Sequence, residues 1–416
     1  MTEPSPRLTV ALAVVILIAG CAAPFQDETA PGDSGEIAVE GAGLPVDPGT
    51  AFDRVTRLTG TNVTPPDSIR VVTPADRRNA SGNDPGFDPA PAFFEVMGVD
   101  SEGGLNESEA ATLENGRTNL GTGAITMYTG ANDSRTVHYV LAHEFVHYVQ
   151  AARDRSVTLR DSLDSTTDAE FVFGSLLEGA AVYTTDAYIA RHIDGNVTNS
   201  ELYVDIRERL GAGSYPAYTN SRYIAGWRYL EERDPRYDAM DSVYENPPRT
   251  GEQVIHGLAP GSEPPRNLSV TENTGAYRRI GTDRLGEGFL RIALRNGLDR
   301  NRANAAAAGW GNDSLRTYRP RSGGSAAYAW VLRFDDADNR TEFASAFEDS
   351  LATRGTRTEE GWRINGTTFG LERVSSDSVV VFIGTDQFVR NTSVSGGDGN
   401  VSITLPESAG VTAGKS

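Results

Sequence analysis

Two histidines that flank a glutamate form the run with the clearest chemical potential, His143-Glu144-Phe145-Val146-His147. Residues four apart share one face of a helix, so both imidazoles can reach one metal ion. Glu144 is not needed as a ligand, and its carboxylate is therefore free to take a proton from a water on that metal. The run predicts a hydrolytic metal centre, provided that it is helical.

The neighbouring residues favour that helix. Asp133 or Ser134 can cap its N-terminus, and apolar residues recur at helical spacing from Val137, with no Gly or Pro before about Arg153. The chain has only five histidines, so the placement of two of them around a glutamate is unlikely to be a chance match. The run matches the H-E-x-x-H pattern of zinc metalloproteases.

A hydrolytic zinc ion needs a third protein ligand and an open position for water. The best candidate is Glu178, thirty-one residues after His147 and followed by Gly179. Over roughly residues 124–192 the chain resembles the gluzincin group of metallopeptidases, whose third ligand is a glutamate on the next long helix. Small residues after that glutamate are expected to let its helix approach the motif helix closely. The resemblance implies His143, His147 and Glu178 as zinc ligands and Glu144 as general base.

One position departs from the gluzincin pattern. Many gluzincins place an aspartate four residues after the glutamate, where it orients a histidine ligand, and this chain has Val182 there. The acceptor for that histidine must come from elsewhere. Asp186 lies about 80° further round the helix and is a poor substitute. The alternative for Glu178 is a solvated helix carboxylate, which its apolar neighbours disfavour.

The other histidines have weaker claims to the site. His138 falls on a different helix face, and His192 stands at a helix end, where a cation is favourable. His256 follows a proline-rich turn and is a candidate to stabilise an oxyanion, the alternative being a packed or surface histidine. Three tyrosines compete for that role: Tyr148, Tyr183 and Tyr223.

The expected elements give an α+β fold. A zincin-like domain over residues 51–275 combines a small sheet with long active-site helices. Its expected strands are 69–72 and 124–128, and its helices 52–58, 134–153, 167–193, 201–210 and 221–233. A capping box at Thr167-x-x-Glu170 is expected to start the third of these helices. Strand 124–128 is expected at the sheet edge beside the metal, where it would favour an extended peptide substrate.

A smaller C-terminal α+β domain is expected over residues 276–392. Its pattern predicts helices at 285–293 and 343–351 and strands at 329–334 and 379–383. Asn365-Gly366 predicts a type I′ turn in a hairpin over 362–369. Nothing in this half has catalytic spacing.

Length and charge restrict the class of protein. The 416 residues suffice for two domains and a sizeable core. A net charge of −19 argues against nucleic-acid binding. All but one of the 38 basic residues are arginine, the exception being Lys415. This acidic, lysine-poor composition resembles that of haloarchaeal proteins.

The N-terminus predicts export and anchoring. Residues 1–21 contain an apolar run too short to span a bilayer comfortably, and they end in a sequence that resembles a lipobox at Cys21. Cys21 is the only cysteine, so lipidation is favoured over a lone buried thiol and no disulfide can form within the chain. Residues 22–50 are expected to be a flexible tether and 393–416 a polar tail.

Asparagines in Asn-x-Ser/Thr are more frequent than chance would give, which fits an exported glycoprotein. The candidate glycosylation sites are Asn62, Asn79, Asn106, Asn132, Asn196, Asn267, Asn312, Asn339, Asn365, Asn391 and Asn400.

The sequence therefore predicts a zinc metallopeptidase on the outer face of the cytoplasmic membrane, held there through lipidated Cys21, that acts on peptides or proteins. One alternative is a non-catalytic surface lipoprotein with a structural zinc site and a binding C-terminal domain. The retention of Glu144 disfavours it, because a structural site has no use for an unligated carboxylate there. Another alternative is a hydrolase of a different bond.

Overall fold

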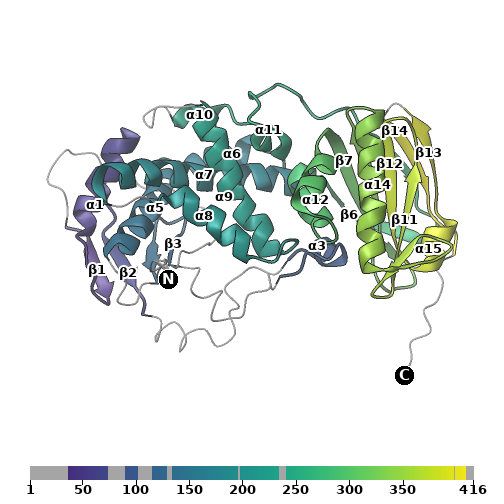
Figure 1. Ribbon diagram of the computed structural model, residues 1–416, viewed down its shortest axis with the longest axis horizontal. Helices are drawn as coiled ribbons and strands as arrows, with labels where there is room; N and C mark the ends of the chain where they lie inside the picture. The colour runs from purple at the N-terminus through teal and green to yellow at the C-terminus, as the bar shows by residue number, and fades with distance from the viewer. Residues whose placement is uncertain are drawn as a thin grey trace, which may run out of the picture. The chain divides into compact units, whose positions relative to one another are not determined.

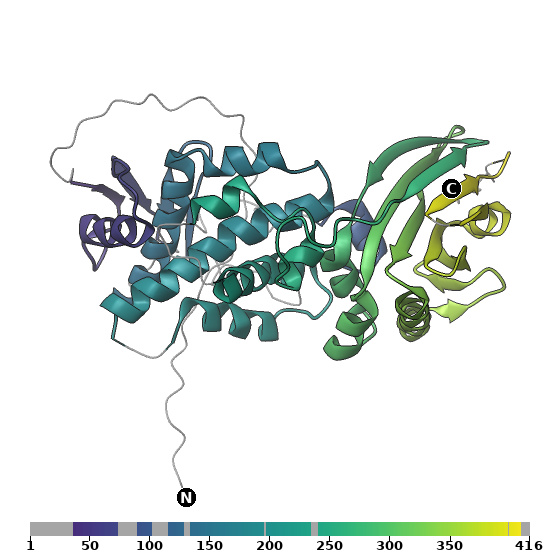
Figure 2. The ribbon, with the colours of Figure 1, turned by 90° about the horizontal axis from the view of Figure 1, so that it is seen from above.

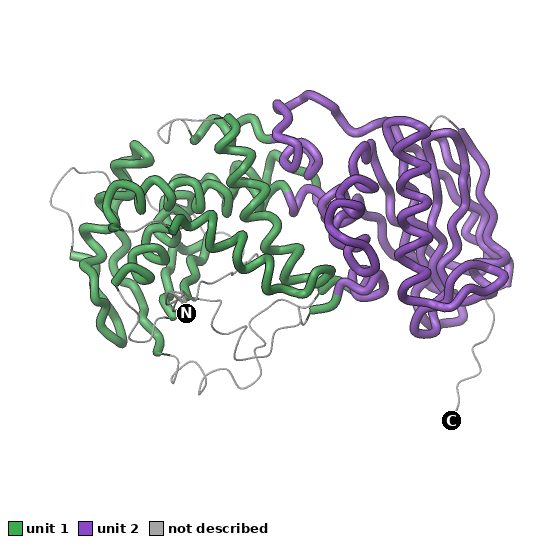
Figure 3. Tube along the Cα trace, viewed as in Figure 1, with its two compact units in different colours: residues 1–91, 100–164, 172–247 green, residues 92–99, 165–171, 248–416 purple. Residues whose placement is uncertain are grey.

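The computed structural model describes residues 36–73, 90–101, 115–128, 134–194, 197–233, 240–397 and 399–408. Both helices and strands are present, with a run of helices from residue 134 to residue 255 between strand-containing segments, so the expected α+β class is confirmed (Figure 1; Figure 2). The chain separates into two compact units (Figure 3). Unit 1 comprises residues 1–91, 100–164 and 172–247, and unit 2 comprises residues 92–99, 165–171 and 248–416. In the described part of the chain, no helix is long and apolar enough to cross a membrane.

A four-stranded sheet in unit 1 has the order β1-β2-β4-β3. Its strands are β1 (Ala38–Gly41), β2 (Ser68–Val71), β4 (Ile125–Met127) and β3 (Gly116–Thr118). The first three run parallel, and β3 is antiparallel to β4. The expected strand at 124–128 exists as β4, but the prediction that it forms the edge is wrong, because β3 pairs along its other side.

Unit 1 contains the five predicted helices, the last of which begins at Tyr215 instead of residue 221, together with two shorter helices that the pattern does not predict. They are α1 (Pro48–Thr59), α5 (Ser134–Ala152), α6 (Arg155–Ser162), α7 (Thr167–His192), α8 (Asn199–Arg209), α9 (Tyr215–Arg233) and α10 (Asp241–Glu245). The expected motif helix is α5, and the expected helix from Thr167 is α7, whose first residues belong to unit 2. The capping prediction is wrong by one residue: Thr166 accepts from the Ala169 N–H at 3.2 Å, whereas the Thr167 side chain donates to Asp283.

Two segments expected to lack structure contain regular elements. Within the expected tether, β1 pairs with β2 and α1 begins at Pro48, where the Asp47 side chain accepts from the Thr50 N–H. Within the expected polar tail, β13 (Ser393–Gly397) pairs with β14 (Asn400–Thr404). Val401 and Ile403 alternate with exposed residues and are buried, which explains why this polar-looking segment folds.

Unit 2 is built on a seven-stranded sheet of order β6-β7-β8-β12-β11-β10-β9. Its strands are β6 (Tyr277–Asp283), β7 (Trp310–Pro320), β8 (Ala327–Phe334), β12 (Ser378–Gly384), β11 (Thr367–Arg373), β10 (Trp362–Ile364) and β9 (Thr356–Arg357). Every pair in this sheet is antiparallel. The predicted hairpin turn is confirmed, because Asn365 and Gly366 both have positive φ.

Each face of this sheet is covered. One face packs against α3 (Ala92–Val96), α12 (Gly286–Leu294) and α14 (Ala337–Arg354), because Phe93, Phe289 and Phe343 of these helices contact Trp330. The helix α13 (Arg300–Ala307) packs against α12 and α14. The other carries a buried cluster with α15 (Asp386–Asn391) and the three-stranded sheet β13-β14-β5, in which β5 is Ser269–Asn273. The remaining short helix is α11 (Gly251–Ile255).

Candidate metal centre

Three ligand-type atoms converge inside unit 1. The Nε2 atoms of His143 and His147 lie 3.1 Å apart, and both lie near Oε2 of Glu178, at 3.3 and 3.0 Å respectively. The three residues are between 7 and 8% exposed. They are the only group of this kind among the described residues that could hold a metal ion.

Local structure explains this convergence. His143 and His147 are one turn apart on α5, and Glu178 comes from the middle of α7. Glycine at position 179 is required by α9, not by the motif helix, because a Cβ there would lie 2.5 Å from the Cα of Gly226. For Gly179 the expected role is therefore corrected: this residue allows α7 and α9 to touch.

The acceptor that could not be identified from the sequence is Gln150. Its Oε1 lies 2.8 Å from Nδ1 of His147, while its Nε2 donates to the Leu177 carbonyl and to the Tyr244 hydroxyl. The Leu177 carbonyl can only accept, so the orientation of the Gln150 amide is fixed and its oxygen faces the imidazole. Nδ1 of His147 then carries the proton, and Nε2 presents its lone pair to a metal.

The carboxylate of Glu144 is held beside this group by strand β3. Its Oε2 accepts from the Thr118 hydroxyl at 2.7 Å. A Cβ at Gly116 would lie 2.8 Å from Oε1 of Glu144, so only glycine leaves room for this carboxylate. Burial raises the pKa of Glu144, and the neighbouring His147 and His143 oppose that shift.

Two tyrosines form the wall next to His143. Tyr223 stacks on the imidazole with 6.1 Å between ring centroids, and Tyr203 stacks on Tyr223 at 4.3 Å. Burial, reinforced by the charges of Glu178 and Glu144, raises the pKa of both phenols well above the ordinary value. Both side chains therefore keep their protons and can donate hydrogen bonds at neutral pH. Tyr223 was among the expected competitors for oxyanion stabilisation, and Tyr203 was missed.

The other sequence candidates lie elsewhere. His138 lies 2.8 Å from the Tyr188 hydroxyl, and the ring of His192 contacts Tyr188 as well. Asp186 accepts from the Ser200 N–H, so it has a structural partner of its own. His256 belongs to unit 2, where it contacts Glu287 at 3.0 Å, and its oxyanion role stays a prediction.

The remaining predicted sites are the glycosylation sequons and the lipidated cysteine. Five candidate sequons are exposed: Asn62, Asn267, Asn365, Asn391 and Asn400. Asn312 and Asn339 are half-buried. Cys21 and four further sequons lie outside the described residues: Asn79, Asn106, Asn132 and Asn196.

The charges of the ligand candidates shift one another's pKa values. Burial disfavours a charged His147, but the carboxylate of Glu178 overcomes this and raises the pKa of His147 to about 9. Burial likewise disfavours a charged Glu178, yet the two histidines lower its pKa to about 2. Without metal, the group is therefore an ion pair at neutral pH, and a metal ion must displace the proton on His147.

This coupling predicts how pH affects metal stabilisation. The folded pKa of His147 lies above its ordinary value of 6.5, so its contribution to stability is complete below pH 6.5 and is lost as pH rises through about 9. Proton competition with zinc falls over the same window. We expect the rise in melting temperature caused by zinc, relative to chelator-treated protein, to increase from pH 6.5 to 9. A rise that is constant or shrinks over this window would contradict the ion pair.

Comparison with known proteins gives one match. A family model described as a domain of unknown function, DUF8575, matches residues 273–392. This segment covers the expected C-terminal domain and contains none of the three metal-ligand candidates. No curated protein and no solved structure matches the chain.

Proposed function

We propose that the chain is an exported, membrane-anchored zinc metallopeptidase that hydrolyses peptide bonds, with a zincin-like catalytic unit of the gluzincin type. The observation that carries the proposal is the buried triangle of His143, His147 and Glu178. Ligand atoms about 2.0–2.1 Å from a tetrahedral zinc ion lie about 3.3–3.4 Å apart. The three observed separations, 3.1, 3.3 and 3.0 Å, are within a few tenths of an ångström of that spacing.

The surrounding residues fit hydrolysis. Zinc would polarise the scissile carbonyl and lower the pKa of the attacking water from about 15.7 toward about 7. Glu144 takes the proton from that water at Oε1, because its Oε2 is occupied by the Thr118 hydroxyl. The same carboxyl then gives the proton to the leaving amine. Tyr223 and Tyr203, protonated and stacked beside His143, are our candidates to donate to the developing oxyanion; in the absence of metal the Tyr223 hydroxyl bonds to Glu178.

Strand β3 favours a polypeptide over other substrates. It is the last strand of its sheet, and within the described residues it pairs on one side only. Its residues Gly116 and Thr118 contact Glu144, so a peptide that pairs with this edge lies next to the proposed base. Backbone pairing of this kind recognises an extended chain.

Removal of the metal tests the proposal. We expect the purified chain to contain about one zinc ion and to degrade an unstructured protein substrate in concentrated salt. A chelator should abolish the degradation, and added zinc should restore it, because zinc supplies the Lewis acid. Degradation that continues in chelator-treated protein shown to be free of zinc would contradict the proposal.

The anchor is tested separately. Cys21 ends a short apolar signal and has no disulfide partner, so we propose that it carries the lipid. A Cys21→Ser variant should move from the membrane fraction to the medium with unchanged zinc content. Retention on washed membranes would show that another segment anchors the chain.

A further inference from the structure

Two arginines that form no ion pair with a described residue lie side by side on the outer strands of the large sheet in unit 2. Arg278 of β6 and Arg319 of β7 are register partners, so their side chains share one face and start about 5 Å apart. Like charges directly opposite each other destabilise a sheet. Both side chains are exposed, and neither forms an ion pair with a described residue. The pair occurs in a chain with 57 acidic and 38 basic residues, so its lack of a carboxylate partner calls for an explanation.

The strand that carries Arg278 also has a free edge. β6 is the first strand of the sheet order, and in the described part of the chain it pairs only with β7. A bulge between Arg279 and Gly281 interrupts the register and presents Ile280, which is 43% exposed. Among the described residues only two other large apolar side chains are exposed, Val39 and Val157. Exposed backbone groups and an exposed apolar side chain thus lie on one strand edge.

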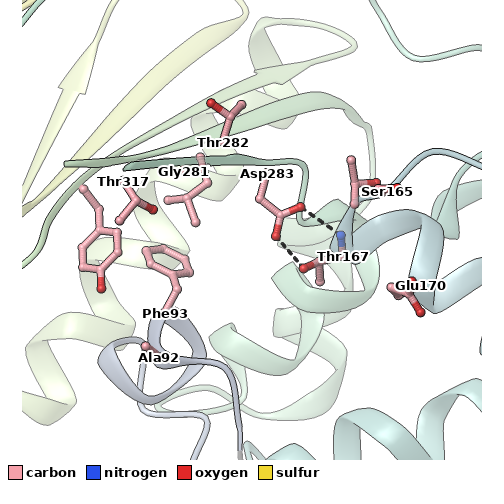
Figure 4. Close-up of a pocket in the computed structure, with 12 residues that line it drawn as sticks. Ala92, Phe93, Ser165, Thr167, Glu170, Gly281, Thr282, Asp283 and Thr317 are labelled. Atoms are coloured by element: carbon pink, nitrogen blue, oxygen red, sulfur yellow. Dashed lines mark hydrogen bonds between the residues drawn. The ribbon is translucent and has the colours of Figure 1, made fainter. Parts of the chain in front are cut away.

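The same face of the sheet is hollowed next to the arginines. A cavity of about 520 Å³ is lined by β6, β7, Tyr328 of β8, Phe93 and the start of α7 (Figure 4). Thr317 lines it and lies opposite Gly281, and Arg319 is two residues further along the same strand face. Phe93 and Tyr328 meet edge to face at 5.1 Å and form an aromatic wall.

Charges at the two ends of this hollow differ. At one end Asp283 accepts from the backbone and hydroxyl of Thr167, so its carboxylate already has partners. At the other end, burial raises the pKa of Tyr328, and the nearby charge of Arg319 opposes this shift. Glu170 also lines the hollow and, like Asp283, has a partner within the chain. The charge around the hollow that has no ion-pair partner among the described residues is therefore that of Arg278 and Arg319.

We propose that this surface binds an extended, acidic polypeptide segment: its backbone pairs with the free edge of β6, a carboxylate contacts Arg278 and Arg319, and an apolar side chain enters the hollow. A strand edge recognises a polypeptide backbone, and arginine matches carboxylates. A nucleic acid would be repelled by the net charge of −19 of the protein. The role of this surface in substrate recruitment rests on the proposed peptidase function, whereas the binding does not.

Binding to the full-length, zinc-loaded chain tests the proposal. The probe is a fluorescent peptide of alternating glutamate and valine, measured by anisotropy at low salt. We expect the double variant Arg278→Gln/Arg319→Gln to weaken binding about three- to tenfold, the effect of two exposed ion pairs. Ile280→Ser should also weaken it. The matched control is Arg302→Gln/Arg373→Gln, which removes two exposed arginines from other parts of unit 2 and should change nothing. Melting curves verify that each variant is folded.

The possible outcomes distinguish a failure of the binding proposal from a failure of the proposed peptidase function. Equal binding by the arginine double variant and by wild type would overturn the proposal. Equal competition by polyphosphate or single-stranded DNA of the same charge would also overturn it, because the surface would then select charge alone. Glu144→Gln should bind the peptide like wild type. In a peptidase assay, the arginine double variant should raise KM for an acidic, unstructured protein and leave kcat unchanged. If no peptidase activity exists but the arginine-dependent binding does, only the proposed function fails.

Discussion

A Glu144→Gln variant is expected to keep its zinc and its fold but to lose about 10²–10⁴-fold of its activity on an unstructured protein substrate. The change preserves the size of the side chain and its hydrogen bond from Thr118, because the amide oxygen can accept as Oε2 does. It removes only the ability to take and return a proton. Among the described residues, Glu144 is the one carboxylate beside the metal group that does not belong to it.

The measurement needs three readouts: zinc content, melting temperature and kcat on the same protein preparation. Glu231→Gln is the matched control, because it makes the same chemical change at an exposed position of α9 in the same unit. We expect its kcat to equal that of wild type. If Glu144→Gln cleaves as fast as wild type, the peptidase proposal fails. A non-catalytic surface lipoprotein with a structural zinc site is then the better interpretation.

The parts of the metal centre that the sequence predicted are those governed by local spacing. His143 and His147 are one turn apart on a helix whose limits follow from its cap and its apolar pattern. Glu178 could be selected because a carboxylate among apolar residues on a long helix requires a partner. Such inferences use only residues within one element, and the structure brings all three residues together.

The contacts that close the site join distant segments, and no local pattern encodes them. Thr118 lies 26 residues from Glu144 and belongs to a strand of only three residues, too short for an alternating pattern to show. Gln150 could have been suggested by its position one turn after His147, but its orientation depends on Leu177 and Tyr244. The contact between Gly179 and Gly226 cannot be predicted from the sequence either, because each glycine by itself is compatible with many structures.

Two incorrect predictions about the fold also arise from contacts between distant segments. The sequence predicts strand 124–128 at the sheet edge because the three residues of β3 are too few to show an alternating pattern, and it predicts a tail after residue 393 because the alternation there is short. β14 pairs in parallel with β5, about 130 residues earlier, and supplies Val401 and Ile403 to a core that the rest of unit 2 builds. When a residue is buried only because its strand pairs with a distant segment, the local sequence pattern predicts that it is exposed to solvent.

The identity of the third ligand gives the second large expected effect. Glu178→Ala should lose zinc binding by more than about 100-fold, the upper range for loss of an outer-shell partner, because a direct ligand disappears. It should also change the metal-free protein. The carboxylate of Glu178 is the main attraction that raises the pKa of His147 to about 9, so the variant should titrate His147 at a lower pH. NMR of the chelator-treated proteins can measure this titration independently of zinc.

Asp186→Ala is the control for this variant, because it removes a half-buried carboxylate from the same helix two turns further on. Asp186 accepts from the Ser200 N–H, and burial raises its pKa to about 6. Its loss removes this hydrogen bond and also a carboxylate whose ionisation is disfavoured by burial, and zinc content should stay at the wild-type level. Full zinc occupancy in folded Glu178→Ala would exclude Glu178 as a ligand and remove the basis for the gluzincin assignment. Loss of zinc together with an unchanged His147 titration would instead show that Glu178 binds metal without pairing with His147 in its absence.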